Sequence, residues 1–193
     1  MALKLITAPA VEPVTLDEAK LVLRVTHSQD DARIERLIRA ARGRCELLTG
    51  RKLIYQTWEQ VLDAFPGSAI DLETPPVSSI TSVTYTDTSG ADVVLDSGDY
   101  TLDTVTDQGR GWLLPSATLG SWPSTCNAAN VVRVRFVSGY GPTAASVPDE
   151  AIEFILCTVA TAYEFPSMLV AGVSVTDIAS KFHERNLDNI RIW

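Results

Sequence analysis

The apolar pattern of this chain changes period twice, and that change limits the possible folds more than any other feature of the sequence. Between residues 34 and 48 the apolar residues recur at steps of three or four, as in a helix with one buried stripe. From Ile54 to Val137, β-branched and aromatic residues alternate with polar ones between turn signals such as Pro75-Pro76. A helical pattern returns from Pro148 to about Glu164. The sequence therefore predicts an α+β fold with a β-rich module inserted into a small helical core.

The helical core is expected to contain three helices, over residues 15–25, 28–49 and 149–164. The first begins with a capping box, in which the Thr15 hydroxyl accepts from the Glu18 N–H while the Glu18 carboxylate reaches back to the N-cap. Ser28 is the expected N-cap of the second helix, and Gly50 is expected to end it. The third helix has a broad apolar face that requires cover from the other two helices or from neighbouring subunits.

Six antiparallel strands are expected in the inserted module. The last of them alternates Arg133 and Arg135 with apolar residues, so one face covers a core and the other is exposed or docked. The region from Pro115 to Asn130 is rich in Ser, Pro, Gly and Asn and is expected to be a loop. The expected strands are Tyr55 to Leu62, Ile80 to Thr86, Asp92 to Leu95, Tyr100 to Asp103, Trp112 to Leu114 and Val131 to Val137.

These patterns divide the chain into four segments. Residues 1–53 hold the N-terminal helices of the core, 54–140 the β-rich insertion, 141–165 the C-terminal core helix and 166–193 an extended C-terminal arm. The arm ends in apolar and basic residues, and two interpretations stay open: it docks onto a partner, or it folds back on its own domain. The candidate docking residues are Phe182, Ile190, Arg191, Ile192 and Trp193.

Charge is unevenly distributed along a chain whose net charge is -8. Residues 33–52 hold seven basic and two acidic residues, whereas residues 53–132 hold ten acidic residues and one basic residue. Such asymmetry suits docking between copies of the chain or against a charged partner. The arginines of the basic stretch contact either DNA phosphates or, more simply, solvent and acidic residues of the same or the next subunit. These candidate contact residues are Arg33, Arg36, Arg39 and Arg42.

Residue types that carry chemistry are sparse, so we expect no enzyme activity, cofactor or metal. Neither of the two histidines has other ligands at metal-binding spacing. Gly139-Tyr140-Gly141 lacks the third glycine of a dinucleotide loop and is expected to be a turn. Glu150 and Glu153 fit charges at a helix N-terminus better than a catalytic pair. The three cysteines are expected to be reduced core residues; they are Cys45, Cys126 and Cys157.

Two further features concern location and an alternative function. No apolar run is long enough to span a membrane, and the N-terminus lacks the pattern of a signal peptide, so we expect neither membrane insertion nor secretion. Trp58, Trp112 and Trp122 fall in the β-rich module, where aromatic faces either pack into the fold or bind sugar rings. The alternative function is therefore a module that binds carbohydrate or a surface polymer.

A series of phrases in fixed order and spacing carries a family resemblance over residues 12–164. The chain resembles the head–tail connector (adaptor) proteins of tailed bacteriophages, in the branch from prophages and gene transfer agents that carries a β-rich insertion. The phrases are Glu12 to Lys20, Leu23-Arg24-Val25, Asp30 to Ile38, Ala40-Ala41-Arg42, Thr49-Gly50-Arg51, Gln56-Thr57-Trp58, Pro75-Pro76-Val77, Val83-Thr84-Tyr85, Phe136 to Gly141 and Val147-Pro148 to Glu164.

The resemblance implies a structural virion protein without catalytic activity. It implies a homo-oligomeric ring, twelvefold in most relatives, that joins the portal to the stopper or tail and lines a channel for double-stranded DNA without reading its sequence. The protein would be made in the cytoplasm of the bacterial host and act in the head–tail neck of the virion. The C-terminal segment of the family tends to reach toward the portal. Here the chain after Glu164 is longer than the family's usual ending, and only Arg191-Ile192-Trp193 matches it.

Overall fold

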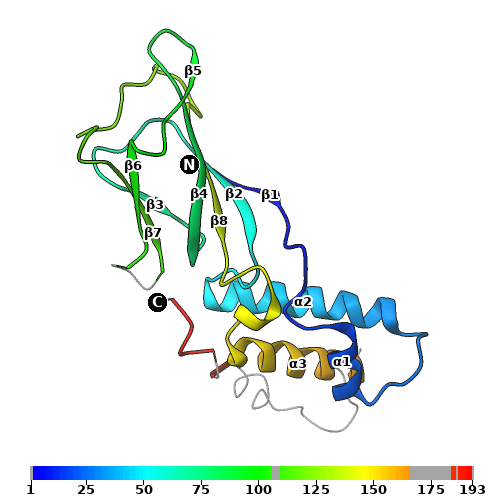
Figure 1. The fold of residues 1–193 in the computed structure, drawn as a ribbon. Helices are drawn as coiled ribbons and strands as arrows, with labels where there is room; N and C mark the ends of the chain where they lie inside the picture. Colours follow the sequence, from blue (N-terminus) through cyan, green and yellow to red (C-terminus); the bar gives the residue numbers. More distant parts are fainter. Residues whose placement is uncertain (1, 106–108, 166–183, 186, 193) are drawn as a thin grey trace, which may run out of the picture. The chain divides into compact units, whose positions relative to one another are not determined.

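The structure is a computed structural model that describes residues 2–105, 109–165, 184–185 and 187–192 (Figure 1). The chain divides into two compact units. Met1–Ala10 and Tyr55–Tyr140 form the first, called here the β unit, and Val11–Ile54 and Gly141–Trp193 form the second, called the helical unit. The first ten residues, which the sequence patterns grouped with the helices, are thus part of the β unit.

The β unit contains two antiparallel sheets (Figure 1). One sheet has five strands in the order β1-β2-β8-β4-β5, and the other has three in the order β3-β7-β6. The strands are β1 (Ala2–Thr7), β2 (Gln56–Leu62), β3 (Ile70–Leu72), β4 (Val77–Thr86), β5 (Asp92–Val94), β6 (Tyr100–Asp103), β7 (Gly111–Pro115) and β8 (Val132–Ser138).

A single apolar core joins the two sheets. Ile70 and Leu113 from the small sheet are buried together with Val83 and Phe136 from the large one. The two sheets therefore pack face to face as a small β-sandwich.

The outer face of β8 confirms the alternation predicted from the sequence. Val132, Val134 and Phe136 are buried, whereas Arg133 and Arg135 are half-buried on the opposite face. The Arg133 guanidinium pairs with Asp92 at 2.6 Å, and that of Arg135 pairs with Glu59 at 2.7 Å. Cross-strand pairs of opposite charge stabilise this face of the sheet.

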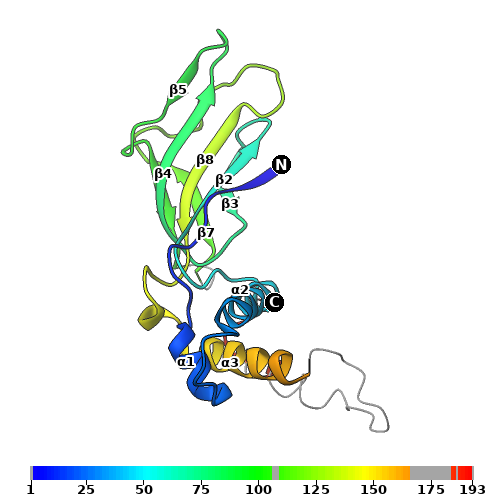
Figure 2. The same cartoon turned by 90° about the vertical axis from the view of Figure 1, so that its right-hand side faces the viewer.

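The helical unit consists of α1 (Leu16–Leu23), α2 (Asp31–Thr49), the short 3-10 helix η1 (Ala144–Ser146) and α3 (Asp149–Glu164). The three α-helices pack against one another, as the side view of the ribbon shows (Figure 2). Their shared core includes Ile34 and Ile38 of α2 and Ile155 and Val159 of α3. This arrangement agrees with the predicted three-helix core.

The first helix begins as predicted, and the second does not. The Glu18 N–H donates to the Thr15 hydroxyl at 3.2 Å, and the Thr15 N–H donates to the Glu18 carboxylate at 2.8 Å. These hydrogen bonds to Thr15 hold the pKa of Glu18 below its usual value. The prediction of Ser28 as N-cap is wrong, because Asp30, two residues later, is the N-cap of α2. The Asp30 carboxylate makes no capping bond and instead accepts from the Tyr163 hydroxyl of α3 at 2.5 Å.

Two strands were missed by the sequence patterns. β1 lies at the edge of the five-stranded sheet, pairs with β2, and is exposed along most of its length. A strand with so little burial shows weak alternation. β3 has only three residues, which is too short to establish a period. Both strands are specified by their partners in the sheet rather than by their own sequence.

Gly111 at the start of β7 provides a test of the packing between the sheets. A Cβ atom added there would lie 2.7 Å from Cγ2 of Val77 and 3.1 Å from Cδ1 of Leu72. We predict that Gly111→Ala lowers the free energy of unfolding by about 1–3 kcal/mol, measured by urea denaturation, because the core must shift to admit the methyl group. Gly98→Ala is the control, since nothing lies within 4 Å of its added Cβ atom. Equal losses in the two variants would contradict this account.

Candidate assembly surface

Two of the four candidate arginines on α2 make their contacts within the helical unit. The Arg33 guanidinium donates to the Tyr163 carbonyl at 3.0 Å and lies over the Tyr163 ring, 4.7 Å from its centre. Arg42 has a largely buried side chain and pairs with Glu12 at 2.7 Å and with Glu46 at 3.4 Å. Both arginines join parts of the helical unit to one another.

Glu46 is the centre of this buried network. Only 7% of the residue is exposed, and its carboxylate accepts from Arg42, from the Lys52 ammonium at 3.5 Å and from the Leu53 N–H at 3.3 Å. Burial alone would lower the pKa of Arg42, but the hydrogen bond to Glu12 and the charge of Glu46 raise it above its ordinary value. The guanidinium therefore stays charged, and the network fixes the segment before α1 and the segment after α2 onto α2 itself.

The other two candidate arginines face outward. Arg39 is about half exposed and lies 4.0 Å from Glu35, at the limit of an ion pair. Arg36 is exposed, and the structure gives it no ion pair within the described part of the chain. These two side chains are the ones available for contacts outside the subunit.

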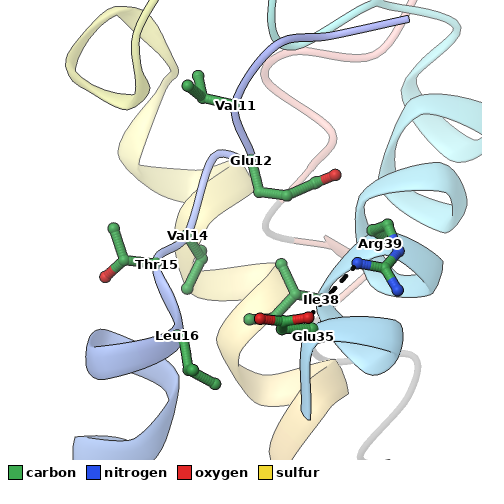
Figure 3. Close-up of a pocket in the computed structure, with 8 residues that line it drawn as sticks. All are labelled: Val11, Glu12, Val14, Thr15, Leu16, Glu35, Ile38 and Arg39. Atoms are coloured by element: carbon green, nitrogen blue, oxygen red, sulfur yellow. Dashed lines mark ion pairs between the residues drawn. The ribbon is translucent and has the colours of Figure 1, made fainter. Parts of the chain in front are cut away.

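A small pocket lies beside this outward part of α2 (Figure 3). Its volume is about 350 Å³, and its walls come from the segment that leads into α1 and from α2. The lining combines apolar and polar side chains, and the Glu35 and Arg39 side chains of α2 point toward each other (Figure 3). The lining residues are Val11, Glu12, Val14, Thr15, Leu16, Glu35, Ile38 and Arg39.

The described end of the C-terminal arm folds back onto α2. Leu187 is fully buried. The Arg191 guanidinium donates to the Leu48 carbonyl at 2.9 Å, and the Ile192 N–H donates to the Thr49 carbonyl at 3.0 Å. These groups satisfy carbonyls at the C-terminal end of α2, where a positive charge is also favourable. Of the two arrangements left open by the sequence, the fold-back is the one seen here.

Three candidate docking residues of the arm remain, and the structure describes one of them. Ile190 accepts a bond of 2.7 Å from Arg51 through its carbonyl, so it also belongs to the fold-back. Phe182 and Trp193 lie outside the described residues. A docking role for any of these residues stays a prediction.

The tryptophans of the β unit are used in packing. The Trp122 ring stacks on Phe65 with centres 4.8 Å apart, and its N–H donates to the Ser68 carbonyl at 2.6 Å. Trp58 packs against the sandwich core. Trp112 is half-buried on β7. Nothing in these contacts favours a sugar-binding platform.

The cysteines and acidic residues of the described chain form no metal cluster. No group of three or more His, Cys, Asp or Glu side chains within the described ranges is placed to hold a metal ion. The three cysteines are free, but of the predicted core residues only Cys45 is buried, whereas Cys126 and Cys157 are half-buried. Burial raises the pKa of Cys45 to about 12. Among the helices described, none is long and apolar enough to cross a membrane.

Sequence comparison identifies the segment that contains α1, α2 and β2 to β4. Residues 13–86 match the model of a family described as phage gp6-like head-tail connector proteins. Over this segment the chain is similar to that connector family. The resemblance deduced from the sequence is thereby confirmed. No protein with a curated description matches the chain.

Solved structures extend the similarity to the whole chain. A chain from the neck of an empty gene transfer agent particle, computed with C6 symmetry, is 22% identical with a TM-score of 0.76, over 96% of this chain and 95% of that one. One from the virion of a native gene transfer agent particle is 22% identical with a TM-score of 0.77, over 100% and 96%. One from the neck of the native particle, computed with C12 symmetry, is 21% identical with a TM-score of 0.72, over 100% and 96%. The chain therefore shares the fold of these chains along its length, and the predicted α+β class is confirmed.

The sequence patterns did not reveal the Glu12 and Glu46 carboxylates that organise the helical unit. Glu46 falls four residues after Arg42, a spacing typical of ion pairs on a helix, and this was the available signal. Glu12 is 30 residues from Arg42, and no local pattern links them.

The Glu46 network predicts a large difference between two acidic residues of α2. We expect Glu46→Gln to lower the free energy of unfolding by about 3 kcal/mol, because Arg42 and Lys52 lose the charge that compensates their burial. Glu35→Gln is the matched control and should change it by less than about 0.5 kcal/mol, since its pair is exposed and long. Urea denaturation of both variants measures the difference. A Glu46→Gln protein as stable as the control would show that the network is not required.

Proposed function

We propose that this protein is a structural virion protein without catalytic activity, a head–tail connector whose copies form an adaptor ring between the portal and the stopper or tail. The observation that carries the proposal is the connector-family match over residues 13–86, together with a fold shared over the full length with chains of gene transfer agent particles. The ring would line a channel through which double-stranded DNA passes without sequence-specific contacts. The protein would be made in the host cytoplasm and act in the head–tail neck of the virion.

Twelve copies are proposed for the ring. The related neck structures were computed with C12 and with C6 symmetry. A ring with twelvefold symmetry also obeys sixfold symmetry, so one copy number is consistent with both. The net charge of -8 is compatible with a lumen to which DNA does not adhere.

Each of the four segments of the chain would have a different role in the adaptor ring. Residues 1–53 and 141–165 would supply most of the helical ring core, 54–140 the β-rich insertion, and 166–193 the arm that reaches the portal. The fold-back of Ile190, Arg191 and Ile192 onto α2 gives the arm a fixed base, since both ends of the segment are then attached to the helical unit. Phe182 and Trp193 are the proposed apolar anchors of the arm.

No observation favours the alternative in which the β-rich module binds carbohydrate. The packing of Trp58 and Trp122 within the sandwich accounts for both residues. The adaptor is therefore the one function proposed.

The proposal predicts that the full-length protein forms a second symmetric ring on its purified cognate portal. Light-scattering chromatography and electron microscopy of the mixture measure ring formation directly. A folded full-length protein that leaves the portal bare under assembly conditions would overturn the proposal.

The docking role of the arm is tested in the same assay with Phe182→Ala combined with Trp193→Ala. Truncation of the arm is less informative, because it would also remove the buried Leu187 and the bonds to the end of α2. We expect the double variant to occupy the portal at least about tenfold less than the wild type, through loss of two aromatic anchors. Val94→Ala, at an exposed apolar residue of β5, is the control and should assemble normally. Equal occupancy by all three proteins would contradict the role of these anchors.

A further inference from the structure

We propose that neighbouring copies of the chain contact each other head to tail through two faces of the helical unit. The outer face of α1 in one copy packs against the outer face of α2 in the next. This inference rests on the proposed ring and adds the residues that form its subunit contact.

The outer face of α2 is a row of five exposed residues. They succeed one another at steps of four, four, three and four, which places them on one side of a helix. The buried Ile38 lies nine residues before Leu47, half a turn away from it around the helix. The row faces away from the core of the unit, and its members are Ala32, Arg36, Ala40, Gly43 and Leu47.

This row has a distinct shape and charge. Ala40 and Gly43 leave a shallow notch, and nothing lies within 4 Å of a Cβ atom added at Gly43. Beyond the notch Leu47 is 75% exposed, which is unusual for so large an apolar side chain. At the other end Arg36 has no ion pair within the described ranges. Along the helix axis, the outer face of α2 thus presents first a cation, then a notch and then an exposed apolar side chain.

The outer face of α1 has the complementary features. Leu21 is 78% exposed and Val22 beside it 50%. One turn before Leu21 lies Asp17, an exposed residue for which the described chain provides no ion pair. The neighbouring Glu18 carboxylate is already occupied by the capping box with Thr15. Asp17 is therefore the acidic group of this face that is free to meet a partner.

The two faces match in register. Asp17 and Leu21 are four residues apart, as are Arg36 and Ala40. When α1 of one copy lies parallel to α2 of another, Asp17 meets Arg36 and Leu21 enters the notch at Ala40 and Gly43. Ridges of one helix fill grooves of the other in this arrangement, and the charged pair sets the register.

The occupant of each face is a second copy because one copy cannot supply both partners. Within a subunit α1 and α2 pack against each other through their buried faces, including Ala19 and Ile38. Their outer faces therefore cannot meet in the same chain. A ring that closes by rotation requires two different, complementary patches on every subunit, and α1 and α2 provide such a pair.

A charge-reversal cycle tests the proposed pair. Arg36→Glu and Asp17→Lys should each reduce ring occupancy on the portal about tenfold or more, since like charges then face each other in every contact of the ring. The protein with both changes should recover most of the wild-type occupancy. Unchanged occupancy in either single variant, or no recovery in the double one, would overturn the inference. Thermal unfolding of each variant alone should match the wild type because both sites are exposed.

Disulfide trapping gives a second readout that distinguishes the geometry. In a chain carrying Cys126→Ser and Cys157→Ser, Leu21→Cys with Ala40→Cys should produce a ladder of covalent multimers when rings on the portal are oxidised. Mixed single variants should give only dimers, and Leu21→Cys alone should give none. Dimers from Leu21→Cys alone, or no ladder on rings that form normally, would overturn the head-to-tail contact while leaving the adaptor function intact. A portal left bare by the wild type would instead remove the adaptor function and the ring together.

Discussion

The helical unit depends on one buried carboxylate, that of Glu46. Ionised groups are stable away from water only when opposite charges or hydrogen-bond donors surround them. Glu46 meets this condition through Arg42, Lys52 and the Leu53 N–H, and Arg42 in turn holds Glu12. The strand-to-helix segment before α1 and the helix-to-strand segment after α2 are thereby tied to the same turn of α2. The geometry of α1 relative to α2, and with it both outer faces, follows from this connection.

The arginine series shows why a charge pattern in the sequence did not reveal its roles. Successive arginines three residues apart on a helix are displaced by about 60° around its axis, so the series crosses the helix surface instead of following one side. Arg33 and Arg42 consequently fall inside the unit, while Arg36 and Arg39 fall outside it. Residues on a single face of the helix would instead succeed one another at steps of three and four. The outer row of α2 does so, but it includes the uncharged residues Ala40 and Gly43, so a charge pattern does not reveal it.

Local signals predicted well those parts of the fold that local interactions specify. The Thr15 capping box, the apolar stripe of α2 and the alternation of β8 all depend on residues within a few positions of one another. Long-range partners were not predictable in this way. Tyr163 draws the Asp30 side chain away from a capping role across 133 residues, and the edge strand β1 exists only because β2 lies beside it. The fold-back of the arm onto α2 is likewise a long-range contact that local patterns could not predict.

The bonds between the arm and α2 also impose an order on the maturation of the chain. Arg191 reaches a carbonyl 143 residues earlier, and α3 packs on helices formed from residues translated long before it. The contiguous part of the β unit is translated before α3 and the arm, whereas the helical unit is completed only after both have been added. Contacts of such sequence separation form late and slowly. Nascent chains therefore present an unfinished helical unit until Arg191 has been synthesised.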